Sequence, residues 1–182
     1  MQLRQLHTDY WEERANKVLS HFRYSTPDEI DIGQICWRYG VRILPMDEPY
    51  TIEAYSLPSQ NARRGTIYIK EGLDPIRKKL LLAEEFCHIY THQVSQLSSN
   101  TAAIHKQEAQ AKRMAAYLLM PERFICDIYE AALDEAVLIS QIADYFLVSD
   151  EFAYYRLELI FNHKVDAVAS LGGKMGTFEW IE

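Results

Sequence analysis

The sequence predicts an α+β fold, in which a small three-stranded sheet with helices is followed by a C-terminal helical region. Three observations predict it. Apolar residues recur at helical spacing before residue 40 and again after residue 75. Between residues 41 and 70 they instead form short runs rich in β-branched and aromatic side chains, closed by Pro or Gly. Pro121 then interrupts the helical pattern. We therefore divide the chain into a domain of residues 1–121 and a helical region of residues 122–182 with a flexible tail.

The composition indicates a folded protein that does not bind nucleic acid through broad charge neutralisation. Of the 182 residues 48% are hydrophobic, with only 7 Gly and 6 Pro. The net charge of -7 disfavours general phosphate binding. The cysteines Cys36, Cys87 and Cys126 are odd in number and widely spaced, which is typical of buried thiols in a reducing compartment. Neither a signal core nor a membrane-length apolar run is found, so we expect a cytoplasmic protein.

The first third of the chain should form two helices and three strands. Apolar spacing predicts a helix over residues 10–22 and a second, short one over residues 28–39, stopped at Gly40. Strands are expected at residues 41–44, 52–57 and 66–70.

Two longer helices follow the strands. Asp74 is a suitable cap and Pro75 a suitable first residue for a helix that ends near Thr91. The polar residues 93–100 should form a loop, and a second helix is expected over residues 101–120.

The first of these helices carries a potential metal-binding pattern. Glu84 and His88 are four residues apart, hence about 40° apart on one face, and Glu85 lies beside them. In zinc proteases with His-Glu-x-x-His, the residues at this spacing hold the metal and the one after the first ligand handles a proton. Here Glu84 stands where the first histidine is usual. The alternative is an amphipathic helix with a solvated Glu pair.

The second helix could supply a third ligand. Glu108 stands at the head of a stripe formed by Ala111, Ala115 and Leu118 or Leu119. Because alanine lets helices approach closely, Glu108 could reach the face of Glu84 and His88. Three protein ligands with one open position are the arrangement of a catalytic zinc. A solvated helical glutamate is the alternative.

Two further histidines leave the assignment of ligands open. His92 is four residues after His88, and His105 is three residues before Glu108. Either could replace the missing ligand or stabilise an oxyanion. The alternative for each is a solvated histidine near a helix end. Cys87, off the ligand face, is expected to pack rather than react.

At this point the sequence resembles the ImmA/IrrE family of metallopeptidases. The run Leu82-Ala83-Glu84-Glu85-Phe86-Cys87-His88 is similar to the family's Ala-His-Glu-x-x-His block. The run from Glu108 to Pro121 is similar to its Glu-x-x-Ala-x-x-Phe-Ala-x-x-Leu-Leu-Met-Pro block, and the likeness extends over roughly residues 28–160. This chain departs from the family pattern at Glu84, and at Lys112, where asparagine is common. Glu-Glu in place of His-Glu is similar to phage-borne members.

The resemblance implies that residues 1–121 form a zincin-like metallopeptidase domain. It implies that Glu84, His88 and Glu108 bind the metal and that Glu85 is the general base. Two carboxylates and a neutral imidazole cancel the charge of a divalent ion, so its water should be acidified less than with two histidines. The implied metal is zinc, although this oxygen-rich set also suits Mn²⁺ or Fe²⁺. We expect weak or substrate-gated hydrolysis that depends strongly on Glu85.

The C-terminal region should contain three helices, over residues 124–132, 135–146 and 150–161. The last two resemble a helix-turn-helix. The candidate recognition helix opens with Asp150 and Glu151 and has one basic residue, Arg156, so it is poorly suited to phosphates. A packing or partner-docking role is favoured. Residues 171–182 should be a flexible end or a docking segment.

Three functional classes remain. The family resemblance implies an endopeptidase that cuts a transcriptional repressor of a prophage or conjugative element. Its substrate could add as a strand to a sheet edge such as residues 66–70. The second class regulates a repressor by binding without cutting, which the unusual Glu84 favours. The third, a DNA-binding regulator using residues 138–160, is disfavoured by charge.

Overall fold

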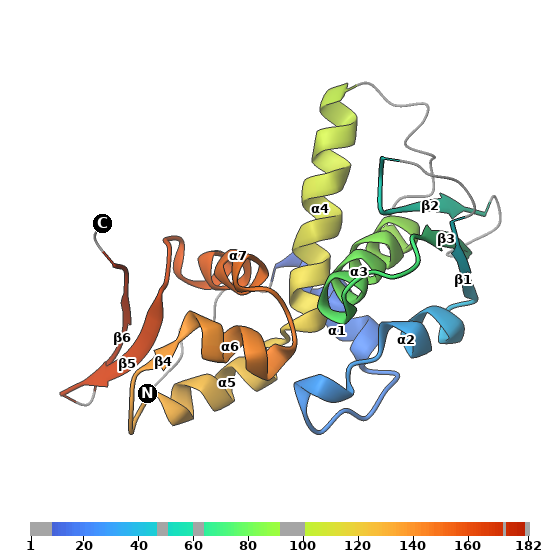
Figure 1. Cartoon of the computed structure of the whole chain (residues 1–182). Coiled ribbons are helices and arrows are strands. Elements are labelled where there is room, and N and C mark those ends of the chain that lie inside the picture. Colours follow the sequence, from blue (N-terminus) through green and yellow to red (C-terminus); the bar gives the residue numbers. More distant parts are fainter. Residues whose placement is uncertain (1–8, 47–50, 60–63, 92–100, 173, 181–182) are drawn as a thin grey trace. The chain divides into compact units, whose positions relative to one another are not determined.

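The computed structural model describes residues 9–46, 51–59, 64–91, 101–172 and 174–180 (Figure 1). It confirms the α+β class and the small sheet. The chain forms two compact units. We call residues 1–23 and 31–118 the N-terminal unit, and residues 24–30 and 119–182 the C-terminal unit.

The N-terminal unit opens with two helices whose starts are set by aspartate caps. Helix α1 (Tyr10–Leu19) begins after Asp9, whose Oδ1 accepts a hydrogen bond of 2.9 Å from the amide of Trp11. Helix α2 (Ile32–Arg38) begins after Asp31. The prediction of one helix from residue 28 is wrong, because Pro27–Glu29 form a separate 3₁₀ turn and the chain is extended before α2.

The sheet of this unit has the strand order β1-β3-β2. Its strands are β1 (Val41–Pro45), β2 (Ala54–Pro58) and β3 (Gly65–Ile69), close to the predicted positions. Strand β3 is parallel to β1 and antiparallel to β2. Both sides of β3 are therefore hydrogen-bonded within the sheet, so the expectation of an open edge at residues 66–70 is wrong. The edges belong to β1 and β2.

Helix α3 (Pro75–Thr91) packs against this sheet, and its bounds are those predicted. Asp74 Oδ2 accepts a hydrogen bond of 3.0 Å from the amide of Arg77, as expected of a cap. At Gly65 the backbone of β3 lies very close to both β2 and α3. A Cβ at Gly65 would lie 2.5 Å from the carbonyl oxygen of Leu57 and 3.0 Å from Cδ1 of Ile89, so only glycine fits.

Helix α4 (Thr101–Leu119) follows, and its predicted alanine stripe is buried. Ala111, Ala115 and Leu118 have no exposed surface. The hydroxyl of Tyr117 donates a hydrogen bond of 3.0 Å to Asp9 Oδ2, so α4 is tied to the start of α1.

The C-terminal unit contains a second sheet that the sequence did not predict. Its strands are β4 (Val137–Leu138), β5 (Ala167–Leu171) and β6 (Lys174–Phe178). They are antiparallel in the order β4-β5-β6. The helix expected from residue 135 begins only at Ile139, because Val137 and Leu138 pair with β5. The prediction of a flexible C-terminal tail is also wrong, because β6 pairs with β5 along its whole length. The elements of this unit are α5 (Glu122–Ala131), β4 (Val137–Leu138), α6 (Ile139–Phe146), α7 (Asp150–Phe161), β5 (Ala167–Leu171) and β6 (Lys174–Phe178).

Helices α6 and α7 form the predicted helix-turn-helix, with Leu147 in the left-handed conformation at φ 51° and Ser149 capping α7. Arg156 is only 2% exposed, and its Nε donates a hydrogen bond of 2.9 Å to the carbonyl of Met120. The one basic side chain of α7 is therefore buried within the unit and does not face solvent. None of the helices in the described part of the chain is long and apolar enough to span a membrane.

Candidate metal centre

Helices α3 and α4 bring two of the predicted ligands into direct contact. His88 Nε2 lies 3.2 Å from Glu108 Oε2. The His88 side chain is 6% exposed, whereas that of Glu108 is 52% exposed. The pair thus joins the packed side of α3 to an exposed glutamate of α4. The spacing predicted that Glu108 could reach the face of His88, whereas the exposure of Glu108 is that of the alternative, a solvated helical glutamate.

The separation in this pair is that of a hydrogen bond, and it is also compatible with two ligands of one divalent ion. Ligand atoms about 2.0–2.1 Å from a tetrahedral ion lie roughly 3.3–3.4 Å from each other. The observed 3.2 Å is close to that value. An imidazole nitrogen and a carboxylate oxygen are both accepted by zinc, manganese and iron. The residues therefore fit a divalent ion at this pair.

Glu84 is on the same face of α3 but in different surroundings. Its carboxyl is half-buried, and burial raises its pKa above the ordinary value. Lys112 and Arg77 oppose that rise with their positive charges. Among the described residues, no three His, Cys, Asp or Glu side chains converge closely enough to hold a metal ion. A direct role of Glu84 as third ligand therefore stays a prediction.

Glu85 is linked to the sheet by a hydrogen bond and interacts electrostatically with the contacting pair. Burial raises the pKa of its carboxyl, a hydrogen bond from the Ser56 hydroxyl opposes the rise, and the charge of Glu108 adds to it. A carboxylate with a raised pKa is a stronger base, which suits it to accept a proton. Ser56 was missed by the sequence reasoning, because it comes from β2 and no local pattern links it to α3.

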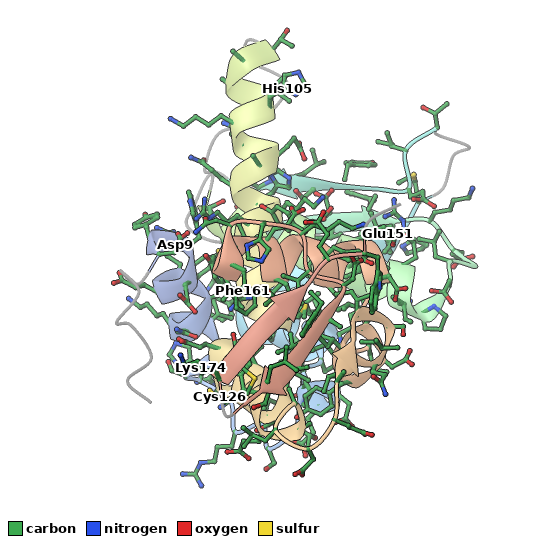
Figure 2. The ribbon with its side chains drawn as sticks, turned by 90° about the vertical axis from the view of Figure 1, so that its left-hand side faces the viewer. Asp9, His105, Cys126, Glu151, Phe161 and Lys174 are labelled. Atoms are coloured by element: carbon green, nitrogen blue, oxygen red, sulfur yellow. The ribbon has the colours of Figure 1, made fainter. Side chains whose placement is uncertain are left out.

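The remaining predicted residues are less closely involved. His105 is exposed near the N-terminal end of α4 (Figure 2). His92 lies outside the described residues. Cys87 is fully buried, and burial raises the pKa of its thiol well above the ordinary value, with smaller effects from Glu84 and Cys36. It is packed as predicted.

These positions define what the chain's own side chains can do. His88 and Glu108 would hold a divalent ion, which would supply Lewis acidity to polarise a peptide carbonyl and acidify water. Glu85 would receive the proton at its carboxylate. The Ser56 hydroxyl orients that carboxylate from the neighbouring strand.

Comparison with known families identifies the class. The family described as IrrE N-terminal-like domain, Peptidase M78, matches residues 36–158, which is more than half of the chain and includes both α3 and α4. This chain belongs to that family. The resemblance read from the two sequence blocks is thereby confirmed.

The fold is shared with a solved structure of remote sequence. A Mycobacterium tuberculosis transcriptional regulator matches with a TM-score of 0.60 and 14% identity. The match covers 81% of this chain and 46% of that one, so the chain spans less than half of that protein's length. At this identity the likeness shows the fold alone. Among curated proteins no sequence matches significantly.

Proposed function

We propose that this chain is a metal-dependent endopeptidase that cuts a transcriptional repressor of a mobile genetic element. The observation that carries the proposal is the 3.2 Å contact between His88 Nε2 and Glu108 Oε2, made across two helices of a Peptidase M78 family member. Those two residues bind the metal, with Glu84 as third ligand. The metal is zinc, with Mn²⁺ or Fe²⁺ as substitutes.

In this proposal Glu85 is the general base. The charges of His88 and Glu108 act on the pKa of its carboxyl, which supports a place for Glu85 in the same cluster of charged groups. In the proposal it takes a proton from the attacking water.

Strand β2 is the best-placed edge for an extended substrate. It is the outer strand next to β3, and its Ser56 donates a hydrogen bond to Glu85. A peptide that pairs with β2 would run past the proposed base, with backbone hydrogen bonds supplying affinity.

One observation favours a second function, in which the chain regulates a repressor by binding it without cutting. The Glu84 carboxyl has Lys112 and Arg77 as its opposing charges, and it does not converge with the other two donors in the described residues. A site in which Glu84 never joins them would bind a metal weakly or not at all. The fold would then serve recognition alone.

The test is to incubate the purified protein and zinc with the repressor encoded beside its gene. A single defined cut that disappears in Glu85→Gln supports the peptidase. The control is Glu71→Gln, which changes an exposed glutamate before α3 and should leave the cut unchanged.

Other outcomes identify the alternatives. A stable complex without any cut, unaffected by Glu85→Gln, supports the binding regulator and contradicts the peptidase. Salt-sensitive binding to operator DNA with no repressor contact would point to a DNA-binding regulator, although the buried Arg156 and the acidic start of α7 argue against it.

A further inference from the structure

Helix α1 contacts both of the helices that carry the ligand pair. It precedes residues 36–158, the part of the chain that matches the family, so its contacts are a feature of this chain that the match does not cover. Asp9, at the start of α1 (Figure 2), reaches α4. Arg14, further along α1, reaches the end of α3. We call these two sets of contacts the α1 anchors.

The anchor at Asp9 holds two side chains of α4. Tyr117 donates a hydrogen bond of 3.0 Å to Asp9 Oδ2, and Arg113 Nη2 forms an ion pair with the same oxygen. Arg113 and Tyr117 are four residues apart, so they lie on one face of the helix. Burial and then the charge of Asp9 raise the pKa of Tyr117 to about 12, so its hydroxyl keeps its proton and can donate. A charged acceptor with two donors fixes the orientation of α4 as well as its distance from α1.

The anchor at Arg14 meets the C-terminal end of α3. Arg14 Nη2 donates a hydrogen bond of 3.2 Å to the carbonyl oxygen of Tyr90, and its Cζ lies 5.2 Å from the centre of the Tyr90 ring. The last carbonyls of a helix have no partner within it, and the helix dipole favours a cation there. Tyr90 comes two residues after His88, so this anchor holds α3 about 3 Å along its axis from the histidine.

Glu108 needs its helix to be held in place, because its side chain is largely open to solvent. It is 52% exposed, whereas the His88 side chain is 6% exposed. The buried stripe of α4 is apolar, and apolar contacts are not directional. The 3.2 Å contact between Glu108 and His88 is at the long end of the range for hydrogen bonds, so a movement of α4 by about 1 Å would break it. Directional contacts elsewhere on the two helices would prevent that movement.

We propose that α1 is a clasp that holds α3 and α4 at the spacing at which His88 meets Glu108, with Asp9 and Arg14 as positioning residues. The consequence for metal binding rests on the site proposed above. Asp9 acts through its two partners on α4, and Arg14 acts through the backbone of α3. Loss of an anchor lets the two donors separate, which weakens metal binding although no donor has been removed.

The first test needs no metal. The ring nitrogen chemical shifts of His88, measured by NMR, report its hydrogen bond with Glu108, and Glu108→Ala supplies the values for a lost contact. Asp9→Asn removes the charge of the anchor but keeps a side-chain oxygen that can cap α1. We expect its His88 shifts to move from the wild-type values toward those of Glu108→Ala. Unchanged shifts would overturn the clasp.

Two controls separate positioning from stability. Val18→Ala loosens the fully buried side of α1 and should lower the thermal midpoint while leaving the His88 shifts at their wild-type values. Glu13→Gln changes an exposed acid of α1 and should alter neither. Equal shift changes in Asp9→Asn and Val18→Ala would mean that α1 acts through stability alone, which overturns the clasp. Tyr117→Phe removes only the donor hydroxyl and provides the same test if Asp9→Asn fails to fold.

A zinc titration in competition with a chromophoric chelator tests the consequence. We expect Asp9→Asn to bind zinc about tenfold more weakly than wild type, at the lower end of the effects of residues that orient metal ligands. Arg14→Met should weaken binding in the same direction, while Lys17→Met, at an exposed position of α1, should bind like wild type. Val18→Ala should also bind like wild type at temperatures where it is folded.

The results separate the two proposals. If wild type and Asp9→Asn bind zinc equally tightly while His88→Ala does not bind it, the clasp has no role in the site and is overturned, and the metal site stands. If wild type binds no zinc but the His88 shifts move as expected in Asp9→Asn, the metal site fails and the clasp is supported on its own.

Discussion

The pKa values of carboxyl groups removed from solvent are shifted in opposite directions in the two units. In the C-terminal unit Asp166 is 2% exposed, yet its pKa is lowered, first by a hydrogen bond from the Tyr154 hydroxyl and then by one from the Trp180 amide. Those bonds are 2.5 and 2.7 Å long. In the N-terminal unit burial dominates instead, and the pKa values of Glu84 and Glu85 are raised.

The difference separates a carboxylate that stabilises the fold from the two acids proposed to act in the metal site. The negative charge of Asp166 is satisfied by donors that the chain itself holds in place, so it links α7 to the end of β6. For the carboxyls of α3 burial is the largest influence on the pKa and outweighs the nearby positive charges and the Ser56 hydrogen bond. Buried acids with raised pKa values are typical of functional sites, whereas fully hydrogen-bonded ones are typical of the framework.

The largest expected effect tests the functional side of this comparison. His88→Ala removes a nitrogen donor, so zinc affinity should fall by more than the roughly 10- to 100-fold typical of residues around the ligands. Competition with a chelator measures it. Hydrogen exchange in the C-terminal unit should be unchanged. Exchange that rises equally in both units would indicate general unfolding rather than loss of a ligand.

Asp166→Asn tests the structural side. The amide keeps the shape but replaces an acceptor oxygen with a donor that faces the Tyr154 hydroxyl or the Trp180 amide. The thermal midpoint should fall by several degrees while zinc affinity stays that of wild type. Asp134→Asn, at an exposed position of the same unit, is the control. A weakened zinc site with an unchanged midpoint would reverse the roles assigned to the two units.

Gly65→Ala tests whether β3 packs against β2 and α3 as closely as the distances at Gly65 indicate. The added Cβ would meet the Leu57 carbonyl and Ile89, and overpacking of this kind costs about 1–3 kcal/mol. Denaturant unfolding measures the loss. Ala102→Gly, at an exposed position of α4, should cost at most about 1 kcal/mol. Equal costs at the two positions would show that β3 and α3 can separate without penalty.

The pH dependence of stability should have opposite signs in the two units. The folded pKa of Glu84 is raised above its ordinary 4.5, so its contribution to stability is fully present below pH 4.5 and is lost as pH rises through the folded value. The folded pKa of Asp166 is lowered from 3.8, so its contribution is present above pH 3.8 and is lost as pH falls through the folded value.

Residue-resolved hydrogen exchange of the metal-free protein, measured from below pH 3.8 to above pH 4.5, tests the direction of the pH dependence in each unit. Glu84→Gln should flatten the loss of protection near α3 toward neutral pH, and Asp166→Asn should flatten the loss near β6 in acid. If Glu84→Gln leaves the pH dependence of hydrogen exchange in α3 unchanged, burial does not raise the pKa of the Glu84 carboxyl.

The sequence predicted most of the features that depend on neighbours along the chain, although the 3₁₀ turn at Pro27–Glu29 was missed. The bounds of α3 follow from Asp74 as cap and Pro75 as first residue, and the left-handed glycine after α2 was found at Gly40. The i and i+4 spacing placed Glu84 and His88 on one helix face, and the alanine stripe after Glu108 indicated that this residue could reach that face from a second helix. Capping, proline geometry and helical periodicity act over a few residues, so they can be read without a structure.

The tertiary structure decided what depends on distant partners. Residues 167–171 and 174–178 became strands because they pair with each other, and residues 167 and 168 also pair with β4. The glycines near this segment had instead suggested a flexible tail. The same holds within the site, where the Ser56 hydrogen bond to Glu85 joins β2 to α3, and Lys112 of α4 is the main cation acting on Glu84. The residue types on α3 were determined by the sequence. Packing determined which groups of other elements act on each carboxyl of α3, such as the Ser56 hydroxyl on Glu85 and the Lys112 ammonium on Glu84.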